Sequence, residues 1–461
     1  MRFWRGCWNR SRYRADPSMT PVPAPRLLWC VAALIPAAAV AGPLPELWPL
    51  CVLGLVMVGT IAAVDLQAAL RHGRLPKVEL IAVNRLTKDR AARLPLIVNY
   101  ADAAPARVRL ALALPGSFES EQVDVIVEPP ANGKRALVNW VCTARRRGRF
   151  RVGVACLEAT SRWGFWMLRK QQLLAAELRV YPNLFSERKQ LAALFLNRGA
   201  SGVQLRRMVG RGREFERLRE YQPGDSFDEV HWKGTAKRGR PITKVFQVER
   251  TQEIYVIIDA SRLSGRPATQ DGKTVTTLER HITATLVLLL AASQQGDRFG
   301  LVTHDAQVRT FLRAGSGAAH YGACREAIHA LEPSENSPDF AEIFSLLRTR
   351  LRRRSLLIFL TDLGDPVLAD DFAKNVRVLS RQHLVLVNQV RTPGVEPLFA
   401  REVAGDDEIH ARLAGHFQWR EARDIASRLQ PLGVTAAMLT NERFAADLVG
   451  QYMQVKRRQL L

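Results

Sequence analysis

Two long apolar runs open the chain. They read LLWCVAALIPAAAVAG at 27–42 and LWPLCVLGLVMVGTIAAVDL at 47–66, and the second carries no charge before Asp65. A helix of about 20 apolar residues crosses a bilayer, and a proline such as the one in the first run is tolerated in membrane helices. Only the turn at 43–46 separates the runs. We therefore expect two transmembrane helices at 27–66 that form a hairpin.

The pattern changes to alternating apolar and polar positions between residues 78 and 182. About six short runs of this kind are separated by Pro-Gly, Pro-Pro and Asn-Gly breaks, which are typical of strands joined by turns. Strands at this spacing favour a small antiparallel β-sandwich at 78–182. We find no catalytic constellation in this part of the sequence.

After residue 251, short apolar runs alternate with segments of helical pattern. The strand-like runs lie at 253–259, 298–304, 308–313, 356–362, 383–390 and 434–439. This alternation predicts an α/β domain at 251–461, with an open, mostly parallel sheet that helices cover on both faces. The chain is thus expected to be multi-domain, with a basic tail at 1–26 and a linker segment at 183–250.

Basic residues flank both apolar runs. Arginines crowd the N-terminal tail, and Arg71, Arg74 and Lys77 follow the second run. Because basic flanks stay in the cytoplasm, we expect both termini and the soluble domains on the cytoplasmic side of the membrane. A start at Met19 instead of Met1 would remove five of the tail arginines. The flank after the second run still predicts the same orientation.

The net charge of +23 is complementary to three classes of partner: nucleic acid, an anionic membrane surface and an acidic protein. The arginines are spread along the chain, for example at 206–219, 237–240 and 347–354. Several of these segments have amphipathic patterns, in which charged residues cover a solvated face. We therefore favour solvated faces, and we keep a basic, membrane-associated nucleic-acid-binding protein as the alternative.

The sequence carries none of the common catalytic motifs. It contains no GxSxG or HExxH, and the six cysteines form no CxxC pair. The segment PATQDGKT at 267–274 has Pro267 where a phosphate-binding loop requires glycine. We therefore predict a non-enzymatic protein.

Aspartates end two of the predicted parallel strands, Asp259 in IIDASRLSG and Asp362 in LIFLTDLGD. Ligands of open parallel sheets sit at this edge. Together with the predicted topology, these residues resemble a von Willebrand factor A-like domain. That resemblance implies a metal site in which Asp259, Ser261 and Asp362 bind a divalent cation such as Mg²⁺, as in a metal-dependent adhesion module.

The match to that metal site is incomplete. The third position of the Asp-x-Ser-x-Ser motif is Leu263, which has no side-chain oxygen, and Ser264 is one residue out of register. The threonine of the middle loop has no clear counterpart, although Asp339 lies in that region. The alternative is that Asp259 and Asp362 accept hydrogen bonds from loop amides and from Ser261.

A segment dense in charge, REYQPGDSFDEVHWKGTAKRGRP, occupies 219–241. It predicts a turn at Pro223-Gly224 and a short helix that Asp225 or Ser226 caps and that ends before Gly239. We expect either a clamp in which Trp232 packs against the sheet or a surface that recognises a partner. The residues singled out for these roles are Arg219, Glu220, Tyr221, Pro223, Gly224, Asp225, Trp232 and Lys237.

The order of motifs resembles a known family over nearly the whole chain. GREFERLREYQPGD, DEVHWKGTAK and PITKVF precede the strand that ends in Asp-x-Ser, and RRRGRF, SRWGFW and VYPNL lie upstream. These motifs are similar to the domain of unknown function 58 family. The resemblance implies a bacterial protein anchored in the inner membrane and often encoded beside a MoxR-type AAA+ ATPase. We therefore expect an adaptor that docks such an ATPase through the α/β domain and the 214–241 motif.

Overall fold

The computed structural model describes most of the chain and divides it into two compact units, Met1–Asn183 and Leu184–Leu461. Each unit is treated separately below. The described residues are 19–41, 48–72, 75–101, 107–130, 134–189, 192, 209–222, 226–247, 252–270, 273–398, 400 and 406–458.

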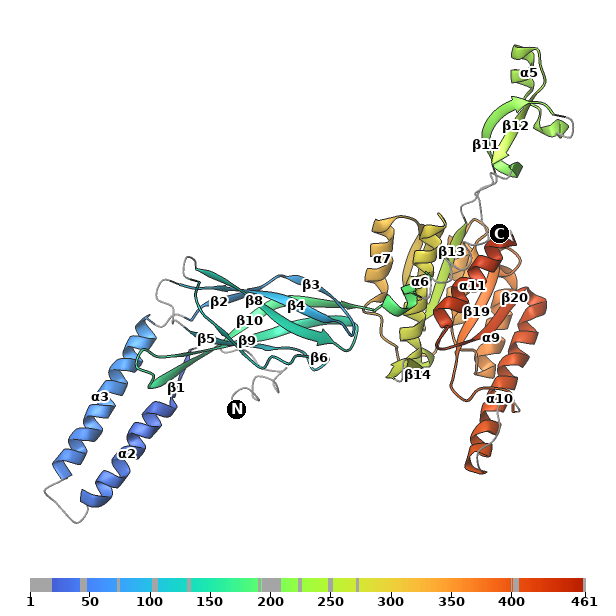
Figure 1. The fold of residues 1–461 in the computed structure, drawn as a ribbon. Coiled ribbons are helices and arrows are strands. Elements are labelled where there is room, and N and C mark those ends of the chain that lie inside the picture. The colour runs from blue at the N-terminus through green and yellow to red at the C-terminus, as the bar shows by residue number, and fades with distance from the viewer. Residues whose placement is uncertain are drawn as a thin grey trace. The chain divides into compact units, whose positions relative to one another are not determined.

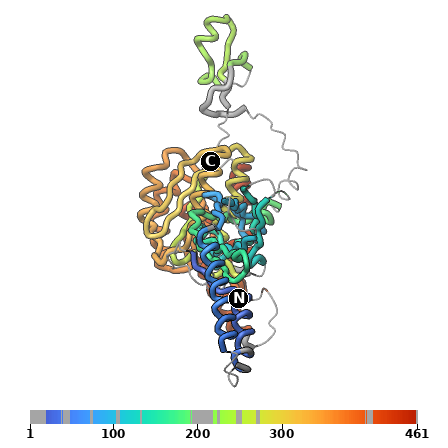
Figure 2. The backbone as a smooth tube through the Cα atoms, turned by 90° about the vertical axis from the view of Figure 1, so that its left-hand side faces the viewer, coloured from blue at the N-terminus to red at the C-terminus, as the bar shows by residue number. Residues whose placement is uncertain are grey.

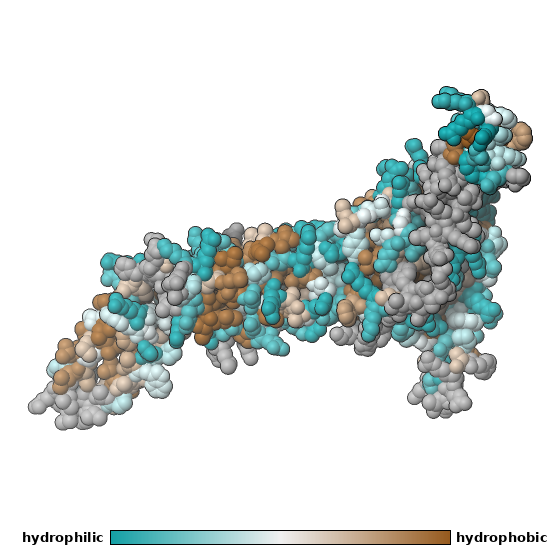
Figure 3. All heavy atoms as spheres, turned by 45° about the horizontal axis from the view of Figure 1, so that its top comes forward, coloured by the Kyte–Doolittle hydropathy of each residue, from teal (hydrophilic) through white to brown (hydrophobic). Residues whose placement is uncertain are grey.

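Two apolar helices belong to the first unit: α2 (Pro25–Ala41) and α3 (Trp48–His72). They lie side by side in both views (Figure 1, Figure 2), and apolar side chains gather along them (Figure 3). Within the described residues, one helix, Trp48–Arg71, is long and apolar enough to cross a membrane by length and composition, and α2 is a shorter apolar helix. The predicted turn at 43–46 lies outside the described residues.

Two β-sheets form the rest of the first unit (Figure 1). The first sheet has the strand order β1 (Thr20–Pro23), β10 (Trp166–Tyr181), β9 (Gly148–Thr160), β5 (Val108–Ala113) and β7 (Val125–Val127), and β3 (Val83–Thr87) also pairs with β10. The second has the order β2 (Lys77–Leu80), β4 (Ala91–Asn99), β8 (Arg135–Ala144) and β6 (Phe118–Glu119). Alternate residues of both sheets enter one buried core, including Leu94 and Trp140 from the second sheet and Leu157 from the first.

Two features of these sheets differ from the sequence expectation. Strand β1 comes from the segment assigned to the N-terminal tail, and it pairs with the start of β10. Its sequence, TPVP, has no alternating pattern that would mark it as a strand. The pairing of β3 with β10 is parallel, so the first sheet is mixed and not purely antiparallel.

A six-stranded sheet forms the centre of the second unit. Its strand order is β17 (Val308–Gly315), β16 (Arg298–His304), β13 (Glu253–Asp259), β18 (Leu356–Leu360), β19 (Leu384–Arg391) and β20 (Val434–Thr440). The pairing of β16 with β17 is antiparallel, and the other four pairings are parallel. The expectation of a mostly parallel open sheet is therefore confirmed, with its strands in the predicted places.

Helices cover both faces of this sheet. The first face packs against α6 (Thr277–Gln294), α7 (Ala318–Ile328) and α11 (Phe444–Arg457). The second packs against α8 (Phe340–Arg350), α9 (Pro366–Leu379) and α10 (Asp406–Leu429). In β13, Val256 enters the first core and Ile257 the second. A strand buried on both faces is apolar along its buried length, which explains the run IYVII after Glu253.

The second unit begins earlier than the predicted domain boundary. Residues 185–189 are helical, and Leu184 packs against the first core of the sheet. Glu187 is buried, with its carboxylate 3.5 Å from the guanidinium of the equally buried Arg280 on α6. Part of the segment expected to be a linker at 183–250 is therefore packed within the α/β unit. A short hairpin, β14 (Pro267–Gln270) with β15 (Lys273–Thr276), lies where the phosphate-loop-like segment was noted.

Candidate functional site

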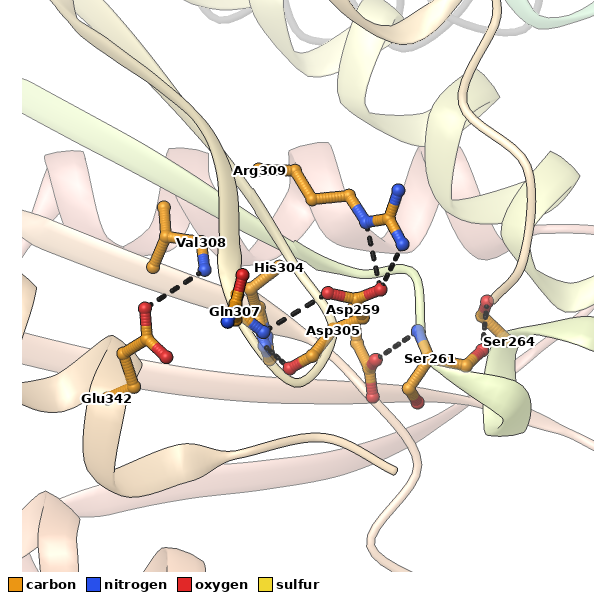
Figure 4. Close-up of polar contacts among 9 residues, drawn as sticks. All are labelled: Asp259, Ser261, Ser264, His304, Asp305, Gln307, Val308, Arg309 and Glu342. Atoms are coloured by element: carbon orange, nitrogen blue, oxygen red, sulfur yellow. Dashed lines mark hydrogen bonds and ion pairs between the residues drawn. The ribbon is translucent and has the colours of Figure 1, made fainter. Parts of the chain in front are cut away.

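Three aspartates end three neighbouring parallel strands of the second unit. Asp259 is the last residue of β13, Asp305 follows β16, and Asp362 lies two residues beyond β18. Because β16, β13 and β18 are adjacent and parallel, these residues come to one edge of the sheet, the carboxyl edge. Figure 4 shows two of them, Asp259 and Asp305. We call Asp259, Asp305 and Asp362 the aspartate row.

The central member, Asp259, is fully enclosed. Its side chain is 1% exposed. One carboxylate oxygen accepts a hydrogen bond from the Ser261 amide at 2.8 Å, and the other accepts one from the Thr361 hydroxyl at 2.6 Å. A buried carboxylate requires such donors to offset the loss of hydration. Both oxygens of Asp259 are therefore engaged inside the protein.

The outer members of the row each hold an arginine. Asp305 accepts hydrogen bonds from Arg309 Nε at 2.8 Å and from the Gln307 amide at 3.1 Å. Burial acts to raise the pKa of Asp305, but these hydrogen bonds outweigh it and hold that pKa well below its ordinary value. Asp362 forms an ion pair with Arg266 through one oxygen and accepts from the Gly364 amide through the other.

The residues at the remaining positions of the metal motif form hydrogen bonds with nearby backbone groups. Ser261 Oγ accepts from the Leu263 amide at 3.4 Å, and the hydroxyl of Ser264 donates to the Ser261 carbonyl at 2.8 Å. Asp339 caps α8 by accepting from the Glu342 amide at 3.1 Å. Each of these side chains therefore has a local structural role.

These residues do not fit a divalent-cation site as they are arranged. The structure brings Asp259 and Ser261 together as the sequence predicted, whereas Asp362 forms an ion pair with Arg266. A cation such as Mg²⁺ requires several oxygens in a near-octahedral array. Among the described residues, no group of three or more histidine, cysteine or acidic side chains could hold a metal ion.

Two buried histidines lie near Asp259, and the sequence did not single them out. His304 pairs in register with Asp259 across β16 and β13, and His281 lies on α6. Burial lowers the pKa of both rings, to about 4 for His281, although the charge of Asp259 acts in the opposite direction. Both imidazoles are therefore neutral at pH 7.

Sequence distance explains why Thr361 and Arg266 were not found. Thr361 lies 102 residues from Asp259, and Arg266 lies 96 residues from Asp362. Arg309 is only four residues from Asp305, so it follows once that aspartate is recognised. Asp305 could have been found, because it follows the strand RFGLVTH as Asp259 and Asp362 follow theirs. The rule that selects strand-end aspartates applies equally to it.

The 214–241 motif forms a separate element of the second unit. Strands β11 (Val209–Glu220) and β12 (Ile242–Gln247) pair antiparallel. Between them lie a 3₁₀ turn at Phe227–Glu229 and the short helix α5 (Trp232–Arg238). The predicted helix end is correct, because Gly239 terminates α5 in the left-handed conformation, with φ of 68°. Of the two predicted caps, Asp225 lies outside the described residues, and Ser226 is the N-cap of the 3₁₀ turn without a side-chain cap hydrogen bond. Helix α5 is instead capped by His231, whose ring nitrogen accepts from the Gly234 amide at 2.9 Å.

The singled-out residues of this motif do not form a buried clamp. Trp232 is 62% exposed and contacts the ring of Phe227 at a centroid distance of 5.8 Å, so it does not pack into a core as one alternative required. Glu220 pairs with Arg240 at 3.3 Å. Arg219 donates to the Glu220 carbonyl, the Tyr221 amide donates to the Pro241 carbonyl, and Lys237 is exposed in the last turn of α5. Pro223, Gly224 and Asp225 lie outside the described residues.

A family model described as "Protein of unknown function DUF58" matches residues 217–398. The chain carries a DUF58 segment. The match confirms the family resemblance that the motifs indicated, and it includes the signature helix α5 and the whole aspartate row.

Two mycobacterial proteins are similar to this chain. They are Uncharacterized protein Mb1516 from Mycobacterium bovis and Uncharacterized protein Rv1480 from Mycobacterium tuberculosis. Each is 24% identical over 280 residues, which is 56% of this chain and 84% of the relative.

Solved structures are similar to a little under half of the chain. Conserved hypothetical protein BatB from Bacteroides thetaiotaomicron has 14% identity and a TM-score of 0.32, covering 45% of this chain and 99% of its own. An aerotolerance-related membrane protein from Bacteroides fragilis has 13% identity and a TM-score of 0.28, covering 45% and 99%. The VWA domain of SpRpn10 has 11% identity and a TM-score of 0.26, covering 44% and 95%.

Proposed function

We propose that this DUF58 chain is a membrane-anchored, non-enzymatic scaffold that docks a protein partner at the carboxyl edge of its α/β sheet. One observation carries the proposal. The aspartate row is closed by donors of the same chain, so its carboxylates are engaged in holding the edge together. This edge also presents guanidinium groups to solvent, because the side chains of Arg266 and Arg309 are 53% and 49% exposed.

The carboxyl edge also has a hollow and exposed apolar side chains that a protein partner could contact. A hollow of about 390 Å³ lies beside the ends of β19 and β20, and the first turns of α10 line it together with Arg391 and Thr440. Helix α10 carries exposed apolar side chains at successive turns, Ile409, Leu413 and Phe417. Exposed apolar side chains on a helix that lines a hollow are typical of protein-docking surfaces.

We infer a MoxR-type AAA+ ATPase as the partner, because the family resemblance associates the two proteins. The exposed Phe227 and Trp232 of the 214–241 motif offer a second contact surface. The inferred location is the bacterial inner membrane, with α2 and α3 as the anchor and both soluble units in the cytoplasm. The basic flank after α3, which includes the exposed Arg71 and Lys77, supports this orientation.

Affinity purification of the full chain from detergent-solubilised membranes, with ATP, ADP or no nucleotide, tests the proposal. We expect the ATPase to be recovered in at least one nucleotide state and to be lost on the charge reversal Arg262→Glu. Arg262 is exposed immediately after Ser261 at the carboxyl edge. Failure to recover the ATPase in any nucleotide state would count against the proposed partner.

Arg348→Glu is the matched control. Arg348 is exposed in the last turn of α8. That helix begins at the carboxyl edge, where the Asp339 amide donates to the Asp305 carbonyl, and at 1.5 Å per residue it runs about 16 Å away from it. The control should leave recovery unchanged, whereas an equal loss from both reversals would indicate a general effect of charge and not a docking edge.

A further inference from the structure

The turn between β9 and β10, residues 161–165, and the first residues of β10 are hydrogen-bonded to α3 and to the segment that leads into α2. Strand β1, which leads directly into α2, pairs with the first residues of β10, and the Ala24 amide donates to the Phe165 carbonyl at 2.8 Å. On the side of α3, the indole nitrogen of Trp166 donates to the Ala62 carbonyl at 2.8 Å. The β9–β10 turn is therefore the place where the anchor and the β-sheets are joined.

Asp65 of α3 fixes this junction. It is 1% exposed. Its carboxylate accepts hydrogen bonds from the Ser161 hydroxyl at 2.5 Å, from the Trp163 amide at 3.2 Å and from the Phe165 amide at 3.3 Å. All three donors come from the β9–β10 turn, so the helix cannot rotate or slide without leaving a buried carboxylate unpaired.

The opposite side of α3 is exposed at the same height and is apolar except for Gln67. Ala62, Asp65 and Ala69 face the first unit and are buried, whereas Val64 and Leu70 are exposed. From Trp48 to Ile61 the helix measures only about 20 Å, which is less than the roughly 30 Å of a bilayer hydrocarbon core. Helix α3 can span that thickness only if lipid also covers its outer side at the level of the turn.

The turn itself has the composition of a membrane interface. Trp163 is 46% exposed at its tip, and exposed Arg162 and Arg26 lie beside it. Gly164 has a positive φ of 78°, and a Cβ there would come within 3.1 Å of the Arg26 guanidinium, so glycine lets that arginine lie against the turn. Tryptophan favours the headgroup layer, and arginine favours anionic lipid.

The geometry points to the β9–β10 turn as the segment through which the first unit contacts lipid, and we call this turn the lipid-contacting seat. Trp163 inserts into the headgroup layer of the bilayer, Arg26 and Arg162 contact anionic phospholipid headgroups, and Asp65 locks α3 to the turn. The inference rests on the membrane anchoring proposed above, and it adds a defined depth and a rigid attachment. The first unit is then seated on the membrane surface and not held above it by a flexible tether.

Tryptophan quenching by brominated phospholipids tests this seat on the full chain in vesicles. Trp163→Phe should reduce the share of tryptophan emission that lipid brominated near the headgroup quenches. The control Trp419→Phe, on α10 of the second unit, should not reduce that share. The reduction should be larger in vesicles with phosphatidylglycerol than in pure phosphatidylcholine. An unchanged share in Trp163→Phe would overturn the seat, and equal reductions in both vesicles would overturn its preference for anionic lipid.

Carbonate extraction of the same vesicles separates the two proposals. A wild-type chain that carbonate removes from the vesicles would refute the anchoring itself. A chain that resists extraction, yet shows no loss of lipid quenching in Trp163→Phe, would leave the anchor intact and refute only the seat.

Discussion

Asp65 in the first unit and Asp259 in the second are built alike. Each follows an apolar run, each is 1% exposed, and each carboxylate accepts from a hydroxyl and from backbone amide nitrogen. Their surroundings differ. The donors to Asp65 all belong to one turn, whereas Asp259 lies between two further carboxylates that each hold a half-exposed arginine.

In both units, the buried aspartate holds neighbouring segments together through its hydrogen bonds. Burial alone does not make Asp259 a ligand site. The surroundings of the two carboxylates differ: apolar helices and an exposed tryptophan lie around Asp65, whereas Asp259 lies between aspartates paired with the half-exposed Arg266 and Arg309. On this difference we base the proposals of a lipid contact for the first region and a protein contact for the second.

Asp65→Ala should have the largest effect. It leaves the Ser161 hydroxyl and two turn amides without their acceptor, and at 1–3 kcal/mol for each unsatisfied group we expect a loss of about 4 kcal/mol. Hydrogen exchange of the Trp163 and Phe165 amides should accelerate most. The control Glu128→Ala removes an exposed ion pair with Arg107 and should cost no more than about 1 kcal/mol. Equal exchange in both variants would contradict the role of Asp65 as a lock.

Acid should destabilise the second unit more than the first. The pKa of His281 is about 4 in the folded chain because of burial, against about 6.5 when unfolded. Between these values the unfolded state binds more protons, so the free energy of unfolding falls as pH drops from about 6.5 to 4, by roughly 3 kcal/mol. Denaturant titrations across this pH range measure the slope.

Replacement of the ring isolates the contribution of His281. His281→Leu should reduce the dependence of stability on pH, because it removes a group whose pKa burial lowers in the folded chain. His410→Leu changes an exposed histidine of α10 and should leave the dependence as it is. A wild-type slope that persists in His281→Leu would show that other groups cause the acid sensitivity.

Asp259→Ala should cost about 2 kcal/mol, because the Ser261 amide and the Thr361 hydroxyl lose their acceptor. Asp259→Asn retains one acceptor oxygen and should cost less. Thermal unfolding of the second unit measures both. If Asp259→Ala were neutral for stability yet abolished partner recovery, Asp259 would be a direct contact and its comparison with Asp65 would fail.

Divalent cations should have the smallest effect. Titration of Mg²⁺ or Mn²⁺ into the full chain should give no saturable heat, because Arg266 already pairs with Asp362 and Leu263 supplies no side-chain oxygen. Arg266→Ala frees Asp362 and is the variant in which weak binding could arise. Saturable binding to the wild type that Asp259→Ala abolishes would restore the metal-dependent adhesion module as the function.

The sequence predicted the α/β strands because most are short, largely apolar runs separated by segments of helical pattern, as EIYVIID is. It could not predict β1, because TPVP becomes a strand only by pairing with residues 166–169, far along the chain. The same holds for β11, whose charged residues pair with β12 across an inserted helix. Patterns along the chain reveal periodicity, whereas these pairings depend on tertiary contacts.

The candidate site was predictable to the same limited extent. Asp259, Ser261 and Asp362 follow from the motif, and Asp259 and Ser261 do lie together. The arginine that holds Asp362 comes from the segment after β13, and no spacing rule connects the two. The cap of α5 was missed because a histidine ring nitrogen accepts the bond that an aspartate or serine usually accepts.

Site-specific photo-crosslinking in native membranes tests the central claim most directly. A photoreactive residue is placed at Arg262 on the carboxyl edge and, in a second chain, at Arg348 near the other end of α8. We predict a crosslink to an AAA+ ATPase from position 262 and none from position 348. Crosslinks of equal yield from both positions, or an ATPase crosslink from position 348 alone, would contradict docking at the carboxyl edge.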